Sequence, residues 1–381
     1  MSIFQLTDRQ LEIREKIKMI TETYVRPLAA ELDKMERFPH ETMERLAKEG
    51  ILGCISPKEY GGEGNDFLSF ILIMEEISKA CGATGSILST HAGLSTYCVT
   101  LFGTEEQKNK YLPFMRQGRL MGFALTEADA GSDAGGMMTR AVKKGDSYII
   151  NGAKMFISSA PVNAFHIIIA VTEKSDDGKK EYTAFIVDRD TPGFSVSPHI
   201  KKMGIRGSLT AEIVMENCAV HESQILGGLG KGMNVALASL DCGRICMGAQ
   251  ALGIAQGAVD ETIQYIGSHD RNGFTISKNQ SIQFKLAELQ TRIDAGRLLL
   301  WRAAALKDAG LPFSTEAAMG KLYNSELAME TTIACAGFMG MDGCTAKYPV
   351  ERMMRDAKIT QIYEGANEIQ KMVIARALGI K

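Results

Sequence analysis

Residues 165–171 (FHIIIAV) decide the fold, because they have the composition of a β-strand in a chain whose two ends are helical in pattern. Three further short runs rich in β-branched and aromatic residues lie near them, at 148–150, 183–187 and 212–215. Turn signals such as Asn151-Gly152 and Thr191-Pro192-Gly193 separate these runs. Short strands joined by turns, with no helix between them, favour a small antiparallel barrel or sandwich.

The segment before these strands has the periodicity of helices. Its apolar residues recur at spacings of three and four, as at Ile13, Ile17, Ile20, Tyr24 and Leu28. Two capping-box patterns mark helix starts: Thr7 with Gln10, and Thr104 with Gln107. We therefore predict an N-terminal helical domain.

The segment after the strands is helical again. Long periodic runs at 233–268, 279–309, 315–335 and 349–363 favour a four-helix bundle, and Asn367 with Gln370 predicts the cap of a last short helix. The predicted class is α+β, with an N-terminal helical domain at 1–120, a middle β domain at 121–228 and a C-terminal bundle at 229–381.

Composition narrows the function classes. The chain has 381 residues, 45% apolar and 23% charged, with a net charge of −2, which gives no electrostatic footprint for nucleic acid. It contains no apolar run long enough to span a bilayer, so no membrane partner is expected. Residues 1–10 have the layout of neither a secretory signal nor a transit peptide. We expect a cytoplasmic protein or the mature form of an organellar one.

The sequence lacks the residue spacings of metal-binding and phosphate-loop motifs. The eight cysteines are scattered without a C-x-x-C pair, and the six histidines show no metal-ligand spacing, so no metal is expected. Cys242 and Cys246 share a helix face, which favours core packing. The glycine-rich segment 227–232 lacks a Walker loop's glycine at Ile225 and its hydroxyl residue at Gly232.

Three elements could carry chemistry. They are 123–133 (FALTEADAGSD), 154–159 (KMFISS) and 354–370 (MRDAKITQIYEGANEIQ). Taken singly, the first is typical of a polar turn after a strand, the second of a strand, and the third of a basic helix end followed by a glycine break. None alone indicates a function.

Together, in this order and spacing, the three elements resemble the acyl-CoA dehydrogenase family, in particular its short-chain, butyryl-CoA dehydrogenase-like members. The resemblance covers essentially the whole chain. It implies bound FAD, a homotetramer built as a dimer of dimers, oxidation of acyl-CoA to trans-2-enoyl-CoA, and an electron-transferring flavoprotein as partner.

By this resemblance Glu364 is the catalytic base that removes the substrate α-proton, while the β-hydride passes to flavin N5. A thioester acidifies its α-C–H only modestly, so abstraction needs a positioned base and a group that bears the enolate charge. The amide of Glu364 is implied as a donor to the thioester oxygen, and Gly365 lets the backbone approach the ligand. Some family members carry the base at the position of Gly243, which here has no carboxylate.

The resemblance also implies the ligand contacts. Ser132 contacts substrate and cofactor, and the other substrate contacts are Asp241, Arg244 and Gly365, although an i,i+3 salt bridge is the competing interpretation of Asp241 and Arg244. Arg271 with Phe274 reaches the FAD pyrophosphate of a neighbouring subunit, assisted by Gln280. The remaining implied FAD contacts are Phe123, Leu125, Thr126, Phe156, Ser158, Gly337, Gly340, Met341, Ala366, Asn367 and Glu368.

Several positions depart from the family pattern. Ala128 replaces the usual proline, and Phe156 replaces a tryptophan and so lacks the indole N–H. The segment 274–280 is two residues short, which affects Gln280. In 337–343 the family usually has glutamine at the first position and paired glycines at the fourth and fifth, where this chain has Gly337, Gly340 and Met341, which affects the FAD contacts there.

Substrate and direction leave alternatives open. Residues 90–99 are implied to line the acyl pocket, and the bulk of Tyr97 favours a short, branched or aryl acyl chain. The same site could run in reverse as an enoyl-CoA reductase. An acyl-CoA oxidase and a catalytically inactive flavin-binding assembly subunit are rival interpretations. The retained Glu364 and the 126–132 loop argue against the inactive subunit, and the missing additional C-terminal domain argues against the oxidase.

Overall fold

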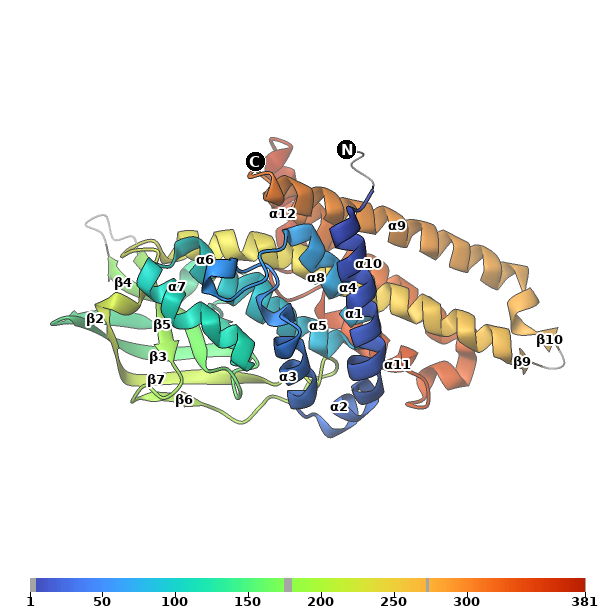
Figure 1. Ribbon diagram of the computed structural model, residues 1–381, viewed down its shortest axis with the longest axis horizontal. Helices are drawn as coiled ribbons and strands as arrows, with labels where there is room; N and C mark the ends of the chain where they lie inside the picture. Colours follow the sequence, from blue (N-terminus) through green and yellow to red (C-terminus); the bar gives the residue numbers. More distant parts are fainter. Residues whose placement is uncertain (1–4, 175–179, 272–273, 381) are drawn as a thin grey trace.

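The structure, a computed structural model, describes residues 5–174, 180–271 and 274–380. A helical unit begins the chain, a sheet follows, and long helices complete it (Figure 1). This order confirms the predicted fold class. The N-terminal helices are α1 (Asp8–Ile20), α2 (Ala29–Met35), α3 (His40–Lys48), α4 (Phe67–Ala80), α5 (Gly82–Leu88), the π-helix η5 (Ser89–Ser95), α6 (Thr96–Phe102) and α7 (Glu105–Tyr111).

Both predicted capping boxes are present. Thr7 and Gln10 bond reciprocally at the start of α1, and Thr104 and Gln107 do so at the start of α7. Each box satisfies backbone N–H groups that have no partner inside the helix. The local sequence therefore determines where these two helices begin.

The middle segment forms an eight-stranded sheet in the order β6-β7-β3-β2-β4-β5-β8, with β1 beside β4. Its strands are β1 (Met121–Ala124), β2 (Arg140–Lys144), β3 (Ser147–Ser158), β4 (Phe165–Lys174), β5 (Lys180–Asp188), β6 (Phe194–Val196), β7 (Thr210–His221) and β8 (Ile225–Leu226). The four predicted strands fall within β3, β4, β5 and β7. Two pairs, β1–β4 and β2–β4, are parallel, so the expectation of purely antiparallel pairing is wrong in this detail. The long connection 125–139 makes this possible, because no tight hairpin forces β1 and β2 to pair.

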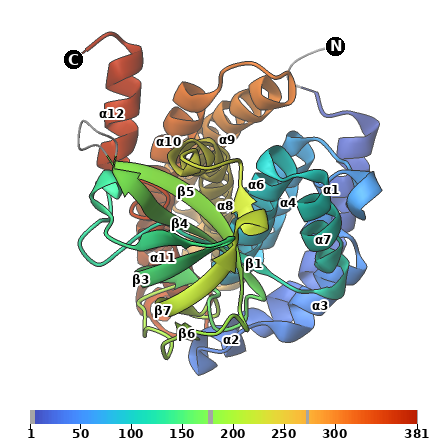
Figure 2. The ribbon, with the colours of Figure 1, turned by 90° about the vertical axis from the view of Figure 1, so that its left-hand side faces the viewer.

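The C-terminal helices are α8 (Gly232–Ser268), α9 (Gln280–Asp308), α10 (Ser314–Met339), α11 (Val350–Ile359) and α12 (Asn367–Ala377). A small hairpin of β9 (Asp270–Arg271) and β10 (Phe274–Thr275) joins α8 to α9. Helix α8 runs from the sheet to this hairpin, about 55 Å at the usual helical rise (Figure 1). Viewed toward the sheet, the N-terminal helices lie to one side and the long helices extend behind (Figure 2).

Two predictions at the C-terminal end need correction. The periodic run 349–363 stops being helical at Ile359. Helix α12 has Ala366 as its N-cap and no side-chain cap, so Asn367 does not cap it. Asn367 is buried, and its side chain bonds to residues of α10 instead. Tertiary partners therefore override the local capping pattern.

The core is centred on α8, which packs against α4 and α10. Glycines bring α4 and α8 close together, because Cβ atoms on Gly253 and Gly257 would overlap the carbonyls of Glu75 and Lys79. The eight cysteines are free, and all except Cys344 are buried. Among the described helices, none has the length and apolar character needed to cross a membrane.

Candidate active site

The residue predicted as base lies in the turn between α11 and α12. Glu364 has φ +51° and Gly365 has φ +93°, so two consecutive residues adopt the left-handed region. For a residue with a Cβ this conformation costs on the order of 1–2 kcal/mol. The turn therefore depends on surrounding contacts to hold it.

The Glu364 carboxylate occupies space that a glycine leaves open. Its Oε2 atom is enclosed and has no hydrogen-bond partner among the described residues, although the residue as a whole is partly exposed. A Cβ on Gly243 of α8 would overlap Oε2, and it would lie 3.4 Å from Leu94. Because Gly243 has no side chain, it leaves the space that the Glu364 carboxylate occupies.

Burial and two nearby cations have opposite effects on the pKa of the Glu364 carboxyl. Removal from water raises the pKa of Glu364 to about 7, while the positive charges of Lys321 and Arg244 act to lower it. A carboxyl group with a pKa near 7 is present in both protonation states at neutral pH. It can therefore accept or deliver a proton there.

Lys321 of α10 was not among the residues predicted from the sequence. Its side chain is fully buried, and Nζ donates to the carbonyl of Gly365 (2.9 Å) and to Oδ1 of Asn367 (2.8 Å). Desolvation lowers the pKa of Lys321 to about 8. The available signal was a single lysine inside the apolar helical run 317–323 (AAMGKLY).

Further hydrogen bonds hold the same turn. Gln370 Nε2 donates to the Gly365 carbonyl (2.7 Å), and Ser325 Oγ donates to Oδ1 of Asn367 (3.1 Å). The Asn367 amide donates to Glu326 Oε1 (2.6 Å). Ala366, between these residues, is half-buried, and Glu368 is exposed.

A second buried lysine holds the loop after β1. Lys154 is fully buried in β3, and its Nζ donates to Glu127 Oε1 (2.8 Å) and to the carbonyl of Leu125 (2.9 Å). Glu127 also accepts from the N–H groups of Met138 and Thr139. Despite desolvation, these donors lower the pKa of Glu127 to about 2. The loop is therefore tied down at both ends.

This loop carries the first group of predicted cofactor contacts. Phe123 is buried at the end of β1, and Thr126 is half-buried, with its carbonyl accepting from Met155 N (2.9 Å). Ser132 is exposed. A Cβ on Gly131 would meet no atom of the described residues within 4 Å, so the loop is open there.

Phe156 is presented to the outside by an irregularity in β3. The pairing of β3 with β7 shifts register between Lys154 and Ile157, and Phe156 has φ +61° and is 62% exposed. Ser158 is half-buried, and its carbonyl accepts from the Asn163 amide. Met155, the residue before Phe156, donates its backbone N–H to the Thr126 carbonyl of the loop, and an exposed aromatic ring suits a planar ring system such as a flavin.

The π-helix η5 connects the base to this region. Leu94 of η5 lies beside Gly243, and Nδ1 of His91, also in η5, accepts from the backbone N–H of Met121 in β1 (3.1 Å). Helix η5 therefore lies between Gly243, which borders the Glu364 carboxylate, and the start of β1. The contacts of η5 thus link the surroundings of the predicted base to β1, the strand that precedes the first group of predicted cofactor residues.

The second group of predicted cofactor contacts lies elsewhere. Gly337, Gly340 and Met341 are at the end of α10, next to Asp342, which accepts from Tyr265 Oη near the end of α8 (2.8 Å). Gly243 and Tyr265 are 22 residues apart, or about 33 Å along the helix. Within a single chain, the second group of predicted cofactor residues is therefore far from Glu364.

The other three members of this second group lie in or just after the hairpin that follows α8. Gln280 is exposed at the first position of α9. The backbones of Arg271 and Phe274 belong to the β9–β10 hairpin, and their side chains lie outside the described part of the chain.

Asp241 and Arg244 lie one turn apart on α8 and form an ion pair, as the competing interpretation predicted. Asp241 also accepts from Ser314 Oγ (2.9 Å), and Arg244 is buried. Arg244 Nε has no partner among the described residues. The pair is therefore structurally engaged, yet retains one unused donor.

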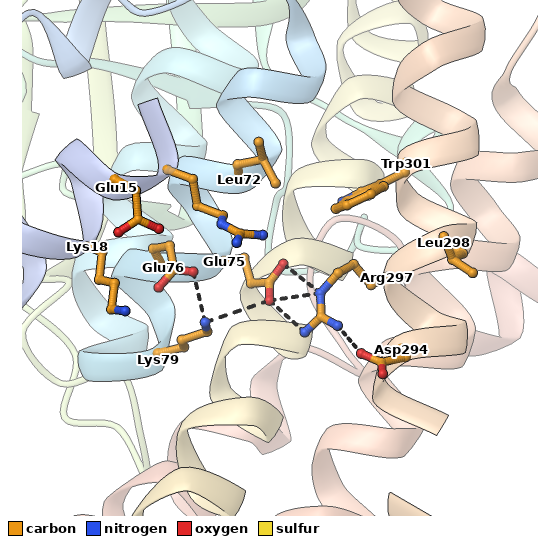
Figure 3. Close-up of a pocket in the computed structure, with 11 residues that line it drawn as sticks. Glu15, Lys18, Leu72, Glu75, Glu76, Lys79, Asp294, Arg297, Leu298 and Trp301 are labelled. Atoms are coloured by element: carbon orange, nitrogen blue, oxygen red, sulfur yellow. Dashed lines mark hydrogen bonds and ion pairs between the residues drawn. The ribbon is translucent and has the colours of Figure 1, made fainter. Parts of the chain in front are cut away.

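A cavity of about 490 Å³ lies apart from all the predicted residues, between α1, α4 and α9 (Figure 3). Its lining alternates in sign: Lys79 pairs with Glu76, and Arg297 bridges to Glu75 and Asp294. The lining holds equal numbers of acidic and basic side chains, so its formal charge is zero.

Comparison with known proteins shows which family has this architecture. Family models for the acyl-CoA dehydrogenase N-terminal, middle and C-terminal domains match residues 7–119, 122–218 and 230–379. A short-chain specific acyl-CoA dehydrogenase of Clostridium acetobutylicum is 43% identical over 98% of both chains. A 3-(aryl)acrylate reductase of Clostridium sporogenes is 43% identical over 98% of this chain and 99% of its own, and an acryloyl-CoA reductase (NADH) of Anaerotignum propionicum is 42% identical over 98% and 95%.

Solved structures agree. Butyryl-CoA dehydrogenase from Megasphaera elsdenii matches with a TM-score of 0.95 at 40% identity, over 98% of this chain and 99% of that one. A chain in a study of the electron transferring flavoprotein of Acidaminococcus fermentans and flavin-based electron bifurcation matches with TM-score 0.95 at 42% identity, with the same coverage. An acyl-CoA dehydrogenase of Bacillus anthracis complexed with FAD matches with TM-score 0.92 at 31% identity, over 98% and 67%. The chain therefore belongs to the acyl-CoA dehydrogenase family of FAD-dependent oxidoreductases.

Proposed function

We propose that this protein oxidises a short, branched or aryl acyl-CoA to the trans-2-enoyl-CoA, with Glu364 as the base that removes the α-proton. The observation that carries the proposal is the Glu364 carboxylate itself. It is enclosed, its Oε2 has no partner among the described residues, and its pKa is raised to about 7. A structural carboxylate would instead be neutralised by a bonded cation.

The turn that carries Glu364 also supplies a donor. The described hydrogen bonds leave the backbone N–H of Glu364 without an acceptor. In the proposal this N–H donates to the thioester oxygen and stabilises the enolate charge that forms when Glu364 takes the proton. Gly365, with no side chain, lets the ligand approach the backbone closely.

We propose FAD as the cofactor, since the exposed Phe156 ring and the open loop near Ser132 fit a planar ring. When bound, FAD supplies the acceptor for the hydride equivalent. The ring contacts are Phe123, Leu125, Thr126, Ser132, Phe156 and Ser158, and Ala366, Asn367 and Glu368 serve the adenosine half.

The second group of cofactor residues supports a homotetramer. Arg271, Phe274, Gln280, Gly337, Gly340 and Met341 contact the FAD of a neighbouring subunit in this proposal. Their separation from Glu364 along α8 supports that assignment. The domain boundaries after 120 and 228 and the cytoplasmic location stay predictions.

The acyl chain is proposed to be short, branched or aryl. Tyr97 packs against Phe67, with ring centroids 6.1 Å apart, and Lys307 lies over both rings. A bulky, fixed ring here supports a short pocket, with Asp241 and Arg244 along the route of the CoA tail. Initial rates with C4-CoA and C16-CoA test this, and faster turnover of the C16 substrate would refute it.

Reduction of an enoyl-CoA is the second candidate. A pKa near 7 makes the protonated form of Glu364 available as an acid, and two relatives with more than 40% identity are named as reductases. We propose an electron-transferring flavoprotein as the electron partner in either direction. Coupled assays with that flavoprotein, run from acyl-CoA and from enoyl-CoA, separate the two by their rates.

The colour of the bound flavin tests the whole proposal. Purified protein loaded with FAD is expected to bleach when an acyl-CoA is added, and its reduced form is expected to reoxidise with an enoyl-CoA. Flavin-loaded protein that does neither with any chain length would be an inactive assembly subunit, and the proposal would be wrong. Peroxide release that matches substrate consumption would instead indicate an oxidase.

A further inference from the structure

We propose that Lys321 is a positioning residue for Glu364: its buried ammonium holds the Glu364–Gly365 turn in place and supplies the positive charge against which the carboxylate ionises. This inference rests on the proposed role of Glu364 as base. It assigns to α10 a direct part in setting the geometry and the charge of the site.

The geometry supports positioning. Lys321 Nζ contacts the turn at the Gly365 carbonyl and at Asn367 Oδ1, on both sides of Ala366. The two left-handed residues, Glu364 and Gly365, come directly before these contacts. A strained backbone persists only where its surroundings hold it, and a buried ammonium forms strong hydrogen bonds to carbonyl oxygens.

The charge of Lys321 is not neutralised locally. Within the described residues, no carboxylate lies within ion-pair distance of Nζ, and its two hydrogen-bond partners are neutral oxygens. Glu364 is the carboxylate whose charge most raises the pKa of Lys321, and Lys321 is the cation that most lowers the pKa of Glu364. Without Lys321, desolvation would act on the carboxylate with only Arg244 opposing it.

Arg244 does not replace Lys321 in this role. Its guanidinium is already paired with Asp241 on the same helix. The other acidic groups that act on Lys321 are Glu326, which accepts from the Asn367 amide, and the exposed Glu368. Lys321 is thus the cation whose loss should change the ionisation of Glu364 most.

Two variants separate charge from position. Lys321→Gln removes the charge and keeps an amide donor for the Gly365 carbonyl, while Lys321→Met removes both. Lys321→Arg keeps the charge, and Lys48→Met removes an exposed lysine at the end of α3 as the matched control. Each protein is prepared with FAD, and its flavin content and thermal midpoint are recorded.

The readout is the titration of the Glu364 carboxyl by infrared difference spectroscopy without substrate, identified as the band absent from Glu364→Gln. We expect Lys321→Gln and Lys321→Met to raise its pKa by about one unit or more. The pH at which bleaching reaches half its maximal rate should move alkaline by the same amount. Lys321→Arg should titrate close to the parent, and Lys48→Met should match it.

The outcomes are distinguishable. Folded, flavin-loaded Lys321→Gln or Lys321→Met that titrates like the parent overturns the inference. If Lys321→Met is unstable, Lys321→Gln answers the same question. A parent protein that never bleaches refutes the proposed function alone, because the infrared titration still measures the effect of Lys321 on Glu364.

Discussion

Two fully buried lysines hold the two halves of the site in different ways. Lys154 in the sheet and Lys321 in α10 each donate to a backbone carbonyl of a site loop, Leu125 and Gly365 respectively. Lys154 also has a carboxylate partner, Glu127, at 2.8 Å. Lys321 has an amide oxygen in the corresponding place.

The difference separates a structural cation from a functional one. The charge of Lys154 is matched by Glu127, so its field is largely cancelled a short distance away. Among the described residues the charge of Lys321 has no bonded counter-ion, so it acts on the Glu364 carboxylate. A buried cation left without a carboxylate partner is costly, and it indicates that the site uses the charge.

The largest effect should follow removal of the carboxylate on which Lys321 acts. Glu364→Gln is expected to lower the rate of flavin bleaching by about three decades, because a positioned general base contributes 10²–10⁴-fold. Flavin content and binding of an enoyl-CoA should be retained, as measured by absorbance and calorimetry. Near-normal bleaching by this variant would show that the charge of Lys321 serves another group.

Next in size is the loss of the matched cation. Lys154→Met leaves the Glu127 carboxylate buried with two backbone N–H donors, so we expect the free energy of unfolding to fall by about 3 kcal/mol. Urea unfolding measures this. The titration of Glu364 should not move, and Lys144→Met, at an exposed position, is the control. An alkaline shift as large as that of Lys321→Gln would erase the distinction between the two lysines.

Displacing the carboxylate without removing it should cost less than deleting it. Gly243→Ala places a Cβ where Glu364 Oε2 lies, and a misplacement of about 1 Å can cost on the order of a hundredfold in rate. A Cβ on Gly267, in the same helix, would meet no described residue within 4 Å, so Gly267→Ala is the matched control. Equal bleaching rates for both variants would mean that the carboxylate has freedom to move.

The pH dependence of stability provides a smaller effect of known sign. The folded pKa of Glu364, about 7, lies above the ordinary value of 4.5, so the folded state binds the proton more tightly and loses stability as pH rises through this window. Above pH 7 the free energy of unfolding of Glu364→Gln should therefore exceed that of the parent by on the order of 2 kcal/mol. Below pH 4 the two proteins should have the same free energy of unfolding. Unfolding at pH 5 and pH 8 measures the difference.

The smallest expected effect concerns a neutral member of the Lys321 cluster. Ser325→Ala removes one donor to Asn367 Oδ1, which Lys321 still satisfies, so unfolding should become easier by about 1 kcal/mol. The pKa of Glu364 should stay within experimental error. A shift comparable to that of Lys321→Gln would assign the effect to the packing of the cluster and not to charge.

Much of the fold was predictable because local signals and tertiary packing agree. The capping boxes at Thr7 and Thr104 were predicted from residue spacing and the strand at 165–171 from composition, and the structure confirms all three. The prediction failed at Asn367, where a capping residue is engaged by buried partners from α10. The parallel pairing of β1 with β4 was not predicted either, because the register between strands that are distant in sequence leaves no local pattern.

The sequence by itself determined the order of helical and β segments, the family and the candidate base, because these follow from periodicity and from motifs contiguous in the chain. Only the tertiary structure decided which groups surround that base. Gly243, Lys321 and Glu364 are far apart in sequence, and three different segments bring them together. The ionisation of Glu364 depends on desolvation and on neighbouring charge, and both properties exist only once the chain has folded.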